Sequence, residues 1–238
     1  MDKPILAFDE RAAINAGRWF ASLSPPLRHD ILRSAQVQRF KDGQLICARG
    51  DPALVWAAVA RGAVRVGGSR MPGKAVTLTY VEPGAWIGDV GIFGGGIRTH
   101  DAYAHGDTTL LQVSRADLFR ILEAHVELYG ALLRLNAGRL RHMFRQIEDL
   151  NTLPLRARLA TQLKGLMRSY GMPLRPDSGE IRIGLSLAQQ DLAGLLGASR
   201  QRVNRELKLM EREETIRVNQ GSLVVRCPET LSRIARRA

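Results

Sequence analysis

A run of long polar side chains follows Ser199 at spacings that would place them on one face of a helix. At 100° per residue, five of them fall within an arc of about 140°: Arg200, Gln201, Asn204, Arg205 and Lys208. Val203, Leu207 and Met210 lie on the opposite side, where they can pack inward. An Arg can donate two hydrogen bonds to guanine O6 and N7, and Gln or Asn can pair with adenine. The pattern therefore predicts a helix that reads bases in a major groove; the alternative is an amphipathic surface helix with solvated arginines.

The residues before this helix predict the first member of a helix-turn-helix pair. A strand is expected over Ile181–Ile183, and Ser186 is the expected N-cap of the following helix, with Gln189 three residues later as in a capping box. The apolar positions of that helix are Leu187, Leu192, Leu195 and Leu196. Gly197 can end it in the left-handed conformation, and Ser199 can cap the next helix. Two helices joined by so short a turn are typical of DNA-binding proteins.

A β-hairpin is expected beside the second helix. Its strands would cover Ile216–Val218 and Leu223–Val225, and its turn would cover Asn219–Ser222. Together with the two helices it completes a winged helix-turn-helix, which favours DNA binding over the surface-helix alternative. The residues that we expect to contact DNA are Ser199, Arg200, Gln201, Arg202, Asn204, Arg205 and Lys208.

The charge of the chain favours a polyanionic partner. The 238 residues carry a net charge of +12, and the pI is near 10.7. From Leu155 to the end, 16 Lys and Arg residues stand against 8 Asp and Glu residues, so a net charge of +8 lies in this part. Such a balance indicates nucleic acid or an acidic membrane surface. A basic surface without any partner is the alternative.

A long helix with an apolar seam is expected over residues 124–153. It contains no proline, and its seam residues recur at spacings of three and four over four heptads, which is typical of a coiled coil. The seam consists of Val126, Tyr129, Leu133, Asn136, Leu140, Met143, Ile147 and Leu150. Asn136 is its polar break and would fix the register of two chains. We therefore expect a homodimer; the alternative is one helix packed on its own domain.

The N-terminal part changes from helical to β-rich near Val37. Short helical pieces are expected over residues 1–34, and Ser114 is the expected N-cap of a helix that follows the β-rich part. Short runs between turn residues predict a β-sandwich or roll, and they cover Val55–Val59, Ala63–Val66, Ala75–Val81 and Thr109–Val113. Pro154 should end the long helix, and a further helix is expected over Leu155–Ser169.

Several other classes of protein are disfavoured by the composition. Cys47 and Cys227 lack the spacing of a disulfide framework or a zinc site, and the five histidines are scattered. No apolar run approaches the roughly 20 residues that span a bilayer, and the first residues do not resemble a signal peptide. We therefore expect a cytoplasmic protein with no membrane partner. The sequence contains no P-loop, nucleophile elbow or HExxH motif, so we expect neither a catalytic residue nor a metal site.

The segment LSLAQQDLAGLLGASRQRVNRELKLMERE, from Leu185 to Glu213, resembles the helix-turn-helix of the cyclic-AMP receptor protein and fumarate–nitrate reductase regulator (Crp/Fnr) family. The resemblance extends over nearly the whole chain. It implies an α+β fold with a β-roll sensor domain over residues 1–123, a coiled-coil dimerisation helix over 124–153 and a winged helix-turn-helix domain over 154–238.

The resemblance also implies roles for residues of the second helix. Arg200 and Arg205 correspond to family residues that contact bases or nearby phosphates. Where the family commonly has a Glu between them, this chain has Gln201. Because Glu accepts from cytosine while Gln suits adenine, we expect a half-site different from that of the cyclic-AMP receptor.

Residues Gly84–Phe93 and the Gly-rich stretch that follows resemble the family's phosphate-binding cassette. The resemblance implies that Arg98 neutralises a cyclic phosphate, that Thr99 donates its hydroxyl, and that an acidic residue beside Gly88 holds a ribose 2′-hydroxyl. Arg139 matches a family Arg that can pair with this acid. The candidate ligand-binding residues are Gly88, Asp89, Val90, Arg98, Thr99, Arg139, Met143 and Phe144.

The cassette also departs from the family pattern. Asp89 is one methylene shorter than the family's Glu, and the loop before Arg98 is one residue shorter than in the cyclic-AMP receptor. Met143 and Phe144 stand where the family has an adenine-binding Thr-Ser pair, and neither has a hydroxyl. Cyclic AMP is therefore disfavoured, and cyclic di-GMP, another nucleotide or no nucleotide remain open. An iron–sulfur cluster would need four thiolates and is excluded, and no Cys/His set indicates haem.

We therefore predict a transcription regulator that binds double-stranded DNA as a homodimer. Its two recognition helices would enter successive major grooves about 34–36 Å apart on a pseudo-palindromic operator. Ligand binding in the β-roll would re-aim them through the long helices. The resemblance further implies a contact between the Gly171–Gly179 loop and RNA polymerase. The rival interpretation is a ligand-sensing module whose DNA-binding domain is constitutive or vestigial.

Overall fold

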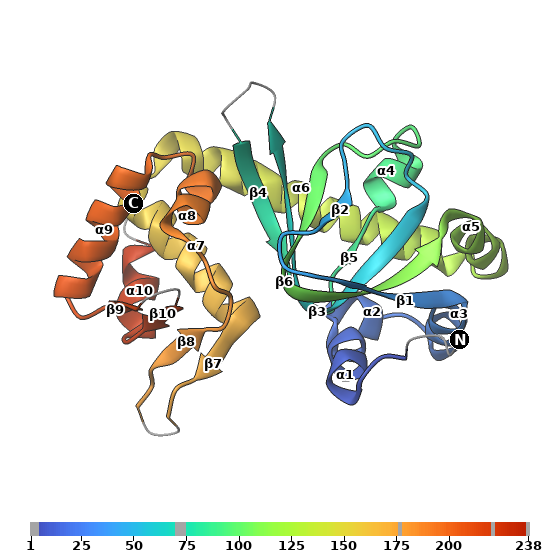
Figure 1. Ribbon diagram of the computed structural model, residues 1–238, viewed down its shortest axis with the longest axis horizontal. Helices are drawn as coiled ribbons and strands as arrows, with labels where there is room; N and C mark the ends of the chain where they lie inside the picture. The colour runs from blue at the N-terminus through green and yellow to red at the C-terminus, as the bar shows by residue number, and fades with distance from the viewer. Residues whose placement is uncertain (1–4, 70–74, 176–177, 220–221, 237–238) are drawn as a thin grey trace. The chain divides into compact units, whose positions relative to one another are not determined.

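The computed structural model describes residues 5–69, 75–175, 178–219 and 222–236 (Figure 1). The chain forms two compact units, Met1–Leu140 and Arg141–Ala238, and the long helix α6 (Glu127–Thr152) contributes residues to both. Each unit combines helices with an antiparallel sheet. The expected α+β class is therefore confirmed.

A six-stranded antiparallel β-roll makes up most of the N-terminal unit. Its strands are β1 (Ala35–Phe40), β2 (Leu45–Cys47), β3 (Val55–Ser69), β4 (Ala75–Val81), β5 (Trp86–Ile87) and β6 (Asp101–Ser114). The main order is β1-β6-β3-β4, with β2 paired to β6 and β5 paired to β3. The prediction of two separate strands within β3 is wrong. Register shifts around Arg61 and the left-handed Gly62 (φ 73°) bend this strand without ending it.

Helices cover the roll and lead out of it. They are α1 (Phe8–Ala16), α2 (Arg18–Ala21), α3 (Pro25–Ser34), α4 (Asp89–Phe93) and α5 (Arg115–Ala124). The predicted N-cap of α5 is confirmed, because Ser114 Oγ accepts the Asp117 N–H at 3.0 Å. The chain turns between α5 and α6, so Val126, the first residue of the expected seam, lies just before α6.

An aromatic cluster anchors the start of α6 to the roll. Trp56 and Trp86 are buried on β3 and β5, and their ring centroids are 4.0 Å apart. Trp19 of α2 packs edge-on against both rings, and its Nε1 donates to the Ala131 carbonyl of α6 at 2.9 Å. All three tryptophans of the protein therefore belong to the N-terminal unit, Trp56 and Trp86 in its core and Trp19 partly buried against that core.

The C-terminal unit is built around α7 (Leu155–Tyr170), which contacts three other helices (Figure 1). These are α8 (Gln189–Leu196), α9 (Arg200–Arg212) and α10 (Pro228–Ile234). Its antiparallel sheet has the order β7-β8-β10-β9 and consists of β7 (Gly171–Pro173), β8 (Ile181–Ile183), β9 (Ile216–Asn219) and β10 (Ser222–Val225). The predicted strands on both sides of the helix pair are confirmed. The centre of the predicted hairpin turn, residues 220–221, lies outside the described residues.

Candidate nucleic-acid interface and candidate ligand site

The first helix of the pair starts later than the sequence predicts. α8 begins at Gln189 with Ala188 at its N-cap, so the prediction of a capping box at Ser186 is wrong. The Asp191 carboxylate accepts the Ala188 N–H at 2.9 Å and supplies the cap. At the other end, Gly197 adopts φ +56°, as predicted, and Arg158 of α7 donates to the Leu196 carbonyl at 2.9 Å. Local capping and one long side chain together fix the turn that aims α9.

The second helix, α9, begins where the sequence predicts. Ser199 Oγ accepts the Arg202 N–H at 3.4 Å, which makes Ser199 the N-cap. Val203, Leu207 and Met210 are buried against the rest of the unit. Because one side of α9 is buried, its other side must face outward.

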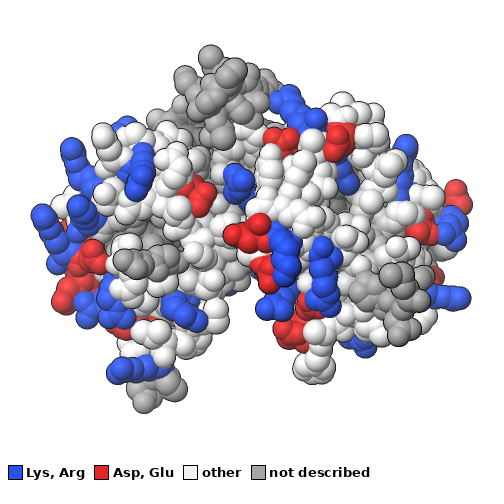
Figure 2. Space-filling view, in the orientation of Figure 1, with Lys and Arg blue, Asp and Glu red and all other residues white. Residues whose placement is uncertain are grey.

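The outward side of α9 carries the expected cations. Five side chains are exposed, and none of them makes an ion pair or a side-chain hydrogen bond within the described residues: Arg200, Gln201, Arg202, Arg205 and Lys208. Figure 2 shows basic side chains gathered over the α9 edge of the molecule, with fewer acidic ones among them. Asn204 is half-buried, and its Oδ1 accepts from Gln189 Nε2 at 3.3 Å. We call these six residues, Arg200, Gln201, Arg202, Asn204, Arg205 and Lys208, the polar face of α9.

Two glutamates to which the sequence assigns no role contact the wing, one from α9 and one from the residue before β8. Glu211 of α9 accepts the Val218 N–H of β9 at 2.8 Å. Glu180 accepts from Arg217 at 3.4 Å and from Arg226 at 3.2 Å. Only the fold brings these residues together, since no short spacing relates Glu180 to Arg226. Glu180 and Glu211 thus engage the wing, and within the described part of the chain neither of them pairs with a cation of the polar face of α9.

The cassette acid of the N-terminal unit is enclosed. Gly88 has φ +103° at the N-cap of α4, and Asp89 next to it is fully buried. Arg139 Nη1 lies 2.9 and 2.8 Å from the two Asp89 carboxylate oxygens, and Asn136 Nδ2 donates to Oδ2 at 2.7 Å. Arg139 also donates to the Trp86 carbonyl. The ion pair implied by the family resemblance is thus present, and it leaves no exposed carboxylate oxygen for a ribose hydroxyl.

Asn136 differs from its expected use as the polar break of a two-chain seam. Its Nδ2 donates within its own chain, to Asp89 and to the Leu132 carbonyl at 3.0 Å. The heptad pattern places Asn136 on the correct helix, but its amide donates to Asp89, which lies 47 positions earlier in the chain. A polar residue in a heptad pattern can thus satisfy a contact inside its own domain.

The residue expected to bind phosphate is also engaged. Arg98 Nη2 donates to the Val55 carbonyl at 2.6 Å and Nη1 to the Gly88 carbonyl at 3.5 Å, while its buried Nε has no hydrogen-bond partner among the described residues. Thr99 is exposed, with its Oγ1 3.0 Å from His100 Nδ1, and Val90 is exposed as well. Val90 and Thr99, which form the rim of the cassette, therefore face solvent. The charged centre of the cassette is closed by contacts within the chain.

The expected seam of α6 is an exposed apolar stripe. Its members are between 48% and 73% exposed: Val126, Tyr129, Leu133, Leu140, Met143, Ile147 and Leu150. Phe144, named as a candidate ligand residue together with Met143, is 61% exposed. Contiguous apolar surface of this kind marks an interaction site in soluble proteins. The stripe is not covered by the chain's own domains, which argues against the single-domain alternative.

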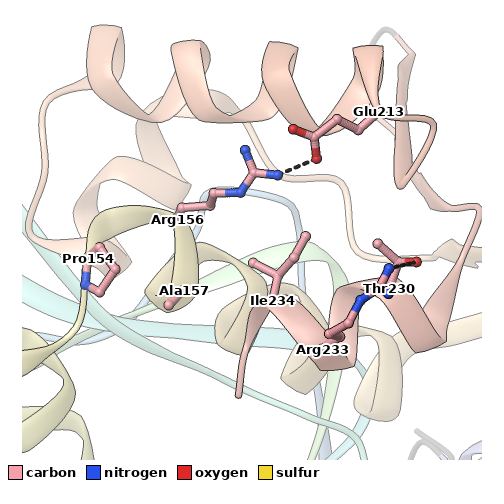
Figure 3. Close-up of a pocket in the computed structure, with 7 residues that line it drawn as sticks. All are labelled: Pro154, Arg156, Ala157, Glu213, Thr230, Arg233 and Ile234. Carbon is pink, nitrogen blue, oxygen red and sulfur yellow. Dashed lines mark hydrogen bonds and ion pairs between the residues drawn. The ribbon is translucent and has the colours of Figure 1, made fainter. Parts of the chain in front are cut away.

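A pocket of about 390 Å³ lies in the C-terminal unit, at the far end of α9 from Ser199 (Figure 3). Its lining consists of Pro154, Arg156, Ala157, Glu213, Thr230, Arg233 and Ile234. Figure 3 shows Arg156 pointing across the pocket to Glu213, with which it forms an ion pair. This pair joins the first turn of α7 to the end of α9, so it supports the helix from the end that does not carry the candidate DNA contacts.

Among the described residues, no three His, Cys, Asp or Glu side chains gather to hold a metal ion. Within the same ranges, no helix combines the length and the apolar character needed to cross a membrane. Cys47 is half-buried, and burial raises the pKa of its thiol.

A β-roll, a long helix with an exposed apolar stripe and a winged helix-turn-helix with unpaired cations define a DNA-binding transcription regulator with a sensor domain. Two family models match the chain in that order. Residues 37–125 match the cyclic nucleotide-binding domain, and residues 157–234 match the Crp-like helix-turn-helix domain. The chain belongs to the Crp/Fnr family of transcription regulators.

Known proteins similar to this one support the assignment along its length. The CRP-like cAMP-activated global transcriptional regulator of Mycobacterium tuberculosis is 28% identical over 217 residues, which cover 91% of this chain and 96% of that one. The cyclic AMP receptor protein of Thermus thermophilus is 29% identical over 216 residues, which cover 91% of this chain and 95% of that protein. The structure of FixK2 from Bradyrhizobium japonicum has the same fold, with a TM-score of 0.75 and 22% identity. The match covers 86% of this chain and 98% of FixK2. The relatives are transcription regulators and not enzymes, which fits the expected absence of catalysis.

Proposed function

We propose that this protein is a cytoplasmic homodimer that binds a pseudo-palindromic DNA operator through two copies of α9. The observation that carries the proposal is the polar face of α9. It presents unpaired cations on the outward side of a helix whose opposite side is buried. Since the N-terminal residues of a recognition helix contact base edges, Arg200, Gln201 and Arg205 are the proposed base contacts. Ser199, Arg202 and Lys208 are proposed to position the helix on the phosphates.

The exposed stripe of α6 supports the dimer. A second copy of the same helix is its natural cover, because coiled-coil seams pair like with like. Two α6 helices side by side would set the spacing of the two α9 helices, and half-sites about one helical turn of DNA apart are then expected. The three-part division at residues 123/124 and 153/154 belongs to this proposal, with α6 as the connector.

Selection of bound fragments from random duplex DNA tests the proposal. The full chain should enrich a pseudo-palindrome, and Arg205→Ala should weaken binding to it by about 1–3 kcal/mol, at one base position per half-site. Lys164→Ala is the matched control, since Lys164 on α7 is exposed and forms no ion pair with any residue that the structure describes. Enrichment of no sequence by the full chain would defeat the proposal. An equal loss on every sequence would make Arg205 a phosphate contact.

For the sensor domain, we propose a phosphate-bearing ligand at the cassette rim rather than cyclic AMP held through Asp89. The rim offers Thr99 and the backbone of a Gly-rich turn, whereas Asp89 is fully buried and already has three donor contacts. Calorimetric titration with cyclic AMP, cyclic GMP and cyclic di-GMP tests this. Asp89→Asn should leave the affinity of any bound nucleotide unchanged, whereas a large loss would restore the ribose-binding role of Asp89.

A regulator that needs no nucleotide is the second candidate. The inward hydrogen bonds of Arg98 favour it, because a phosphate would have to displace contacts that the chain already makes. Operator affinity measured with and without the same three nucleotides separates the candidates. A change in affinity with any of them supports gating, and unchanged affinity with all supports the nucleotide-independent form.

A contact with RNA polymerase remains a proposal for the Gly171–Gly179 loop. The expectation of a loop from Gly171 onward is wrong, because Gly171–Pro173 form β7. Met172 of β7 and Leu174 just after it are 46% and 39% exposed, which suits a protein contact. Residues 176–177 of the loop lie outside the described residues. Met172→Asp should abolish transcription activation in a purified system while operator binding is retained; unchanged activation would exclude the loop.

A further inference from the structure

Asn204 differs from the rest of the polar face of α9 because another side chain holds it. Its Oδ1 accepts from Nε2 of Gln189, the first residue of α8, at 3.3 Å. Both residues are half-buried, whereas the other five members of the polar face are exposed and lack side-chain partners within the described residues. The two helices of the motif are thus joined by one amide–amide hydrogen bond beside the surface proposed to enter the groove.

The position of Asn204 on α9 makes this contact relevant to recognition. At 100° per residue, Asn204 lies about 40° and Lys208 about 80° around the helix from Arg200. Asn204 is therefore near the centre of the polar face and one turn from the N-terminus of α9. A residue at this place projects toward base edges when the helix lies in a major groove.

Resting on the proposed function, we infer that Gln189 is a positioning residue that orients the Asn204 amide so that α9 selects guanine over adenine at one position. A side-chain amide has a carbonyl end that accepts and an NH₂ end that donates. Because the carbonyl end is held by α8, the NH₂ end is the one left for DNA. The surrounding structure, and not Asn204 alone, decides which end is presented.

Base chemistry turns that orientation into specificity. Guanine presents two acceptors in the major groove, N7 and O6, and the two N–H groups of Asn204 Nδ2 can be directed at them. Adenine presents N7 and a donor, the N6 amino group, so its readout by Asn needs the carbonyl end as well. An amide held donor-first would set the N6 donor of adenine against its own donor. This differs from the pairing with adenine that the residue type alone predicts.

Substitution of Gln189 tests the inference, with Asn204→Ala identifying the base position that Asn204 reads. At that position the unmodified protein should prefer guanine to adenine by roughly tenfold or more in selection and in direct binding. In Gln189→Glu, the carboxylate can only accept, so it should draw Nδ2 of Asn204 toward α8 and turn Oδ1 to the DNA. The preference should then move to a base with a donor, adenine or cytosine. In Gln189→Met, the amide is released, and guanine and adenine should bind within about threefold of each other.

Gln190→Glu is the matched control, because it adds the same charge at the next, exposed residue of α8. Gln190→Glu should weaken binding to all DNA sequences alike and leave the base preference unchanged. Adenine preference in the unmodified protein would overturn the inference. The inference would also be overturned if Gln189→Glu and Gln190→Glu showed the same base preference. The proposed DNA-binding function would stand in either case. Absence of any sequence preference in the unmodified protein would instead defeat the proposed function itself.

Discussion

Replacing Arg139 by methionine is expected to destabilise the N-terminal unit by about 3 kcal/mol. Asp89 is fully buried, and Arg139 supplies the charge that compensates it, through contacts of 2.9 and 2.8 Å. After the substitution only the Asn136 amide would donate to this carboxylate. Methionine keeps the apolar stem and a high helix propensity, so the loss reports the missing charge and not a disrupted helix.

The size of the effect follows from the burial of the two partners. Removal of one partner of a fully buried pair costs about 3–5 kcal/mol. The Arg139 side chain is 32% exposed, so water weakens the pair, and the lower end of that range applies. With Asp89→Asn already present, no buried charge remains to be compensated, and Arg139→Met should then cost about 1 kcal/mol or less. The coupling free energy between the two substitutions should therefore be about 2 kcal/mol.

Urea unfolding followed by tryptophan fluorescence measures this directly. All three tryptophans lie in or against the core of the N-terminal unit, so their emission reports the unfolding of that unit. Arg141→Met is the matched control, since Arg141 of α6 is exposed and has no ion-pair partner in the described ranges, and its loss should change stability by less than about 0.5 kcal/mol. All variants should be compared at one protein concentration because a dimer is expected. If Arg139→Met and Arg141→Met unfold at the same urea concentration, the argument from the buried pair is refuted.

Three further outcomes follow from particular contacts. Leu140→Asp should convert the dimer to a monomer in analytical ultracentrifugation, because a carboxylate would enter the stripe, whereas Arg141→Asp should not. Gly197→Ala should lower the urea midpoint in far-UV circular dichroism by the equivalent of about 1–2 kcal/mol, because φ +56° strains a residue with a Cβ; an unchanged midpoint would contradict this. The hydrogen bond from His125 lowers the pKa of Asp30 below its ordinary value, so this contact stabilises the fold above that ordinary pKa and is lost as the pH falls through the lowered pKa. In His125→Gln, NMR titration should show the pKa of Asp30 returning upward, and an unmoved pKa would exclude His125 as its cause.

Features decided by neighbours in the chain could be predicted from the sequence. Ser114, Ser199 and Gly197 cap or end helices where their types indicate, because each satisfies backbone groups within four residues. The start of α8 was mispredicted for a related reason. Both Gln189 and Asp191 can occupy the third position of a capping box, and the structure uses Asp191. A charged acceptor makes the stronger hydrogen bond to a backbone N–H, and this preference was available in the sequence.

Features decided by long-range contacts could not be predicted, and Asn136 is the clearest case. Its heptad position indicates a two-chain seam, but the roll places Asp89 within 2.7 Å of its amide, and periodicity carries no information about that distance. The same contact constrains how the sensor can work. Any ligand group that binds Asp89 must displace one of its donors on α6, Arg139 or Asn136. A ligand can shift the equilibrium between two positions of α6 only by as much free energy as its affinities for these two positions differ. By reciprocity, the position of α6 in which both donors contact Asp89 lowers the binding affinity of such a ligand by the same factor. A ligand that binds only at the cassette rim avoids this competition, and α4 offers it a route to α6, because Asp89 at the start of α4 holds Asn136 and Arg139.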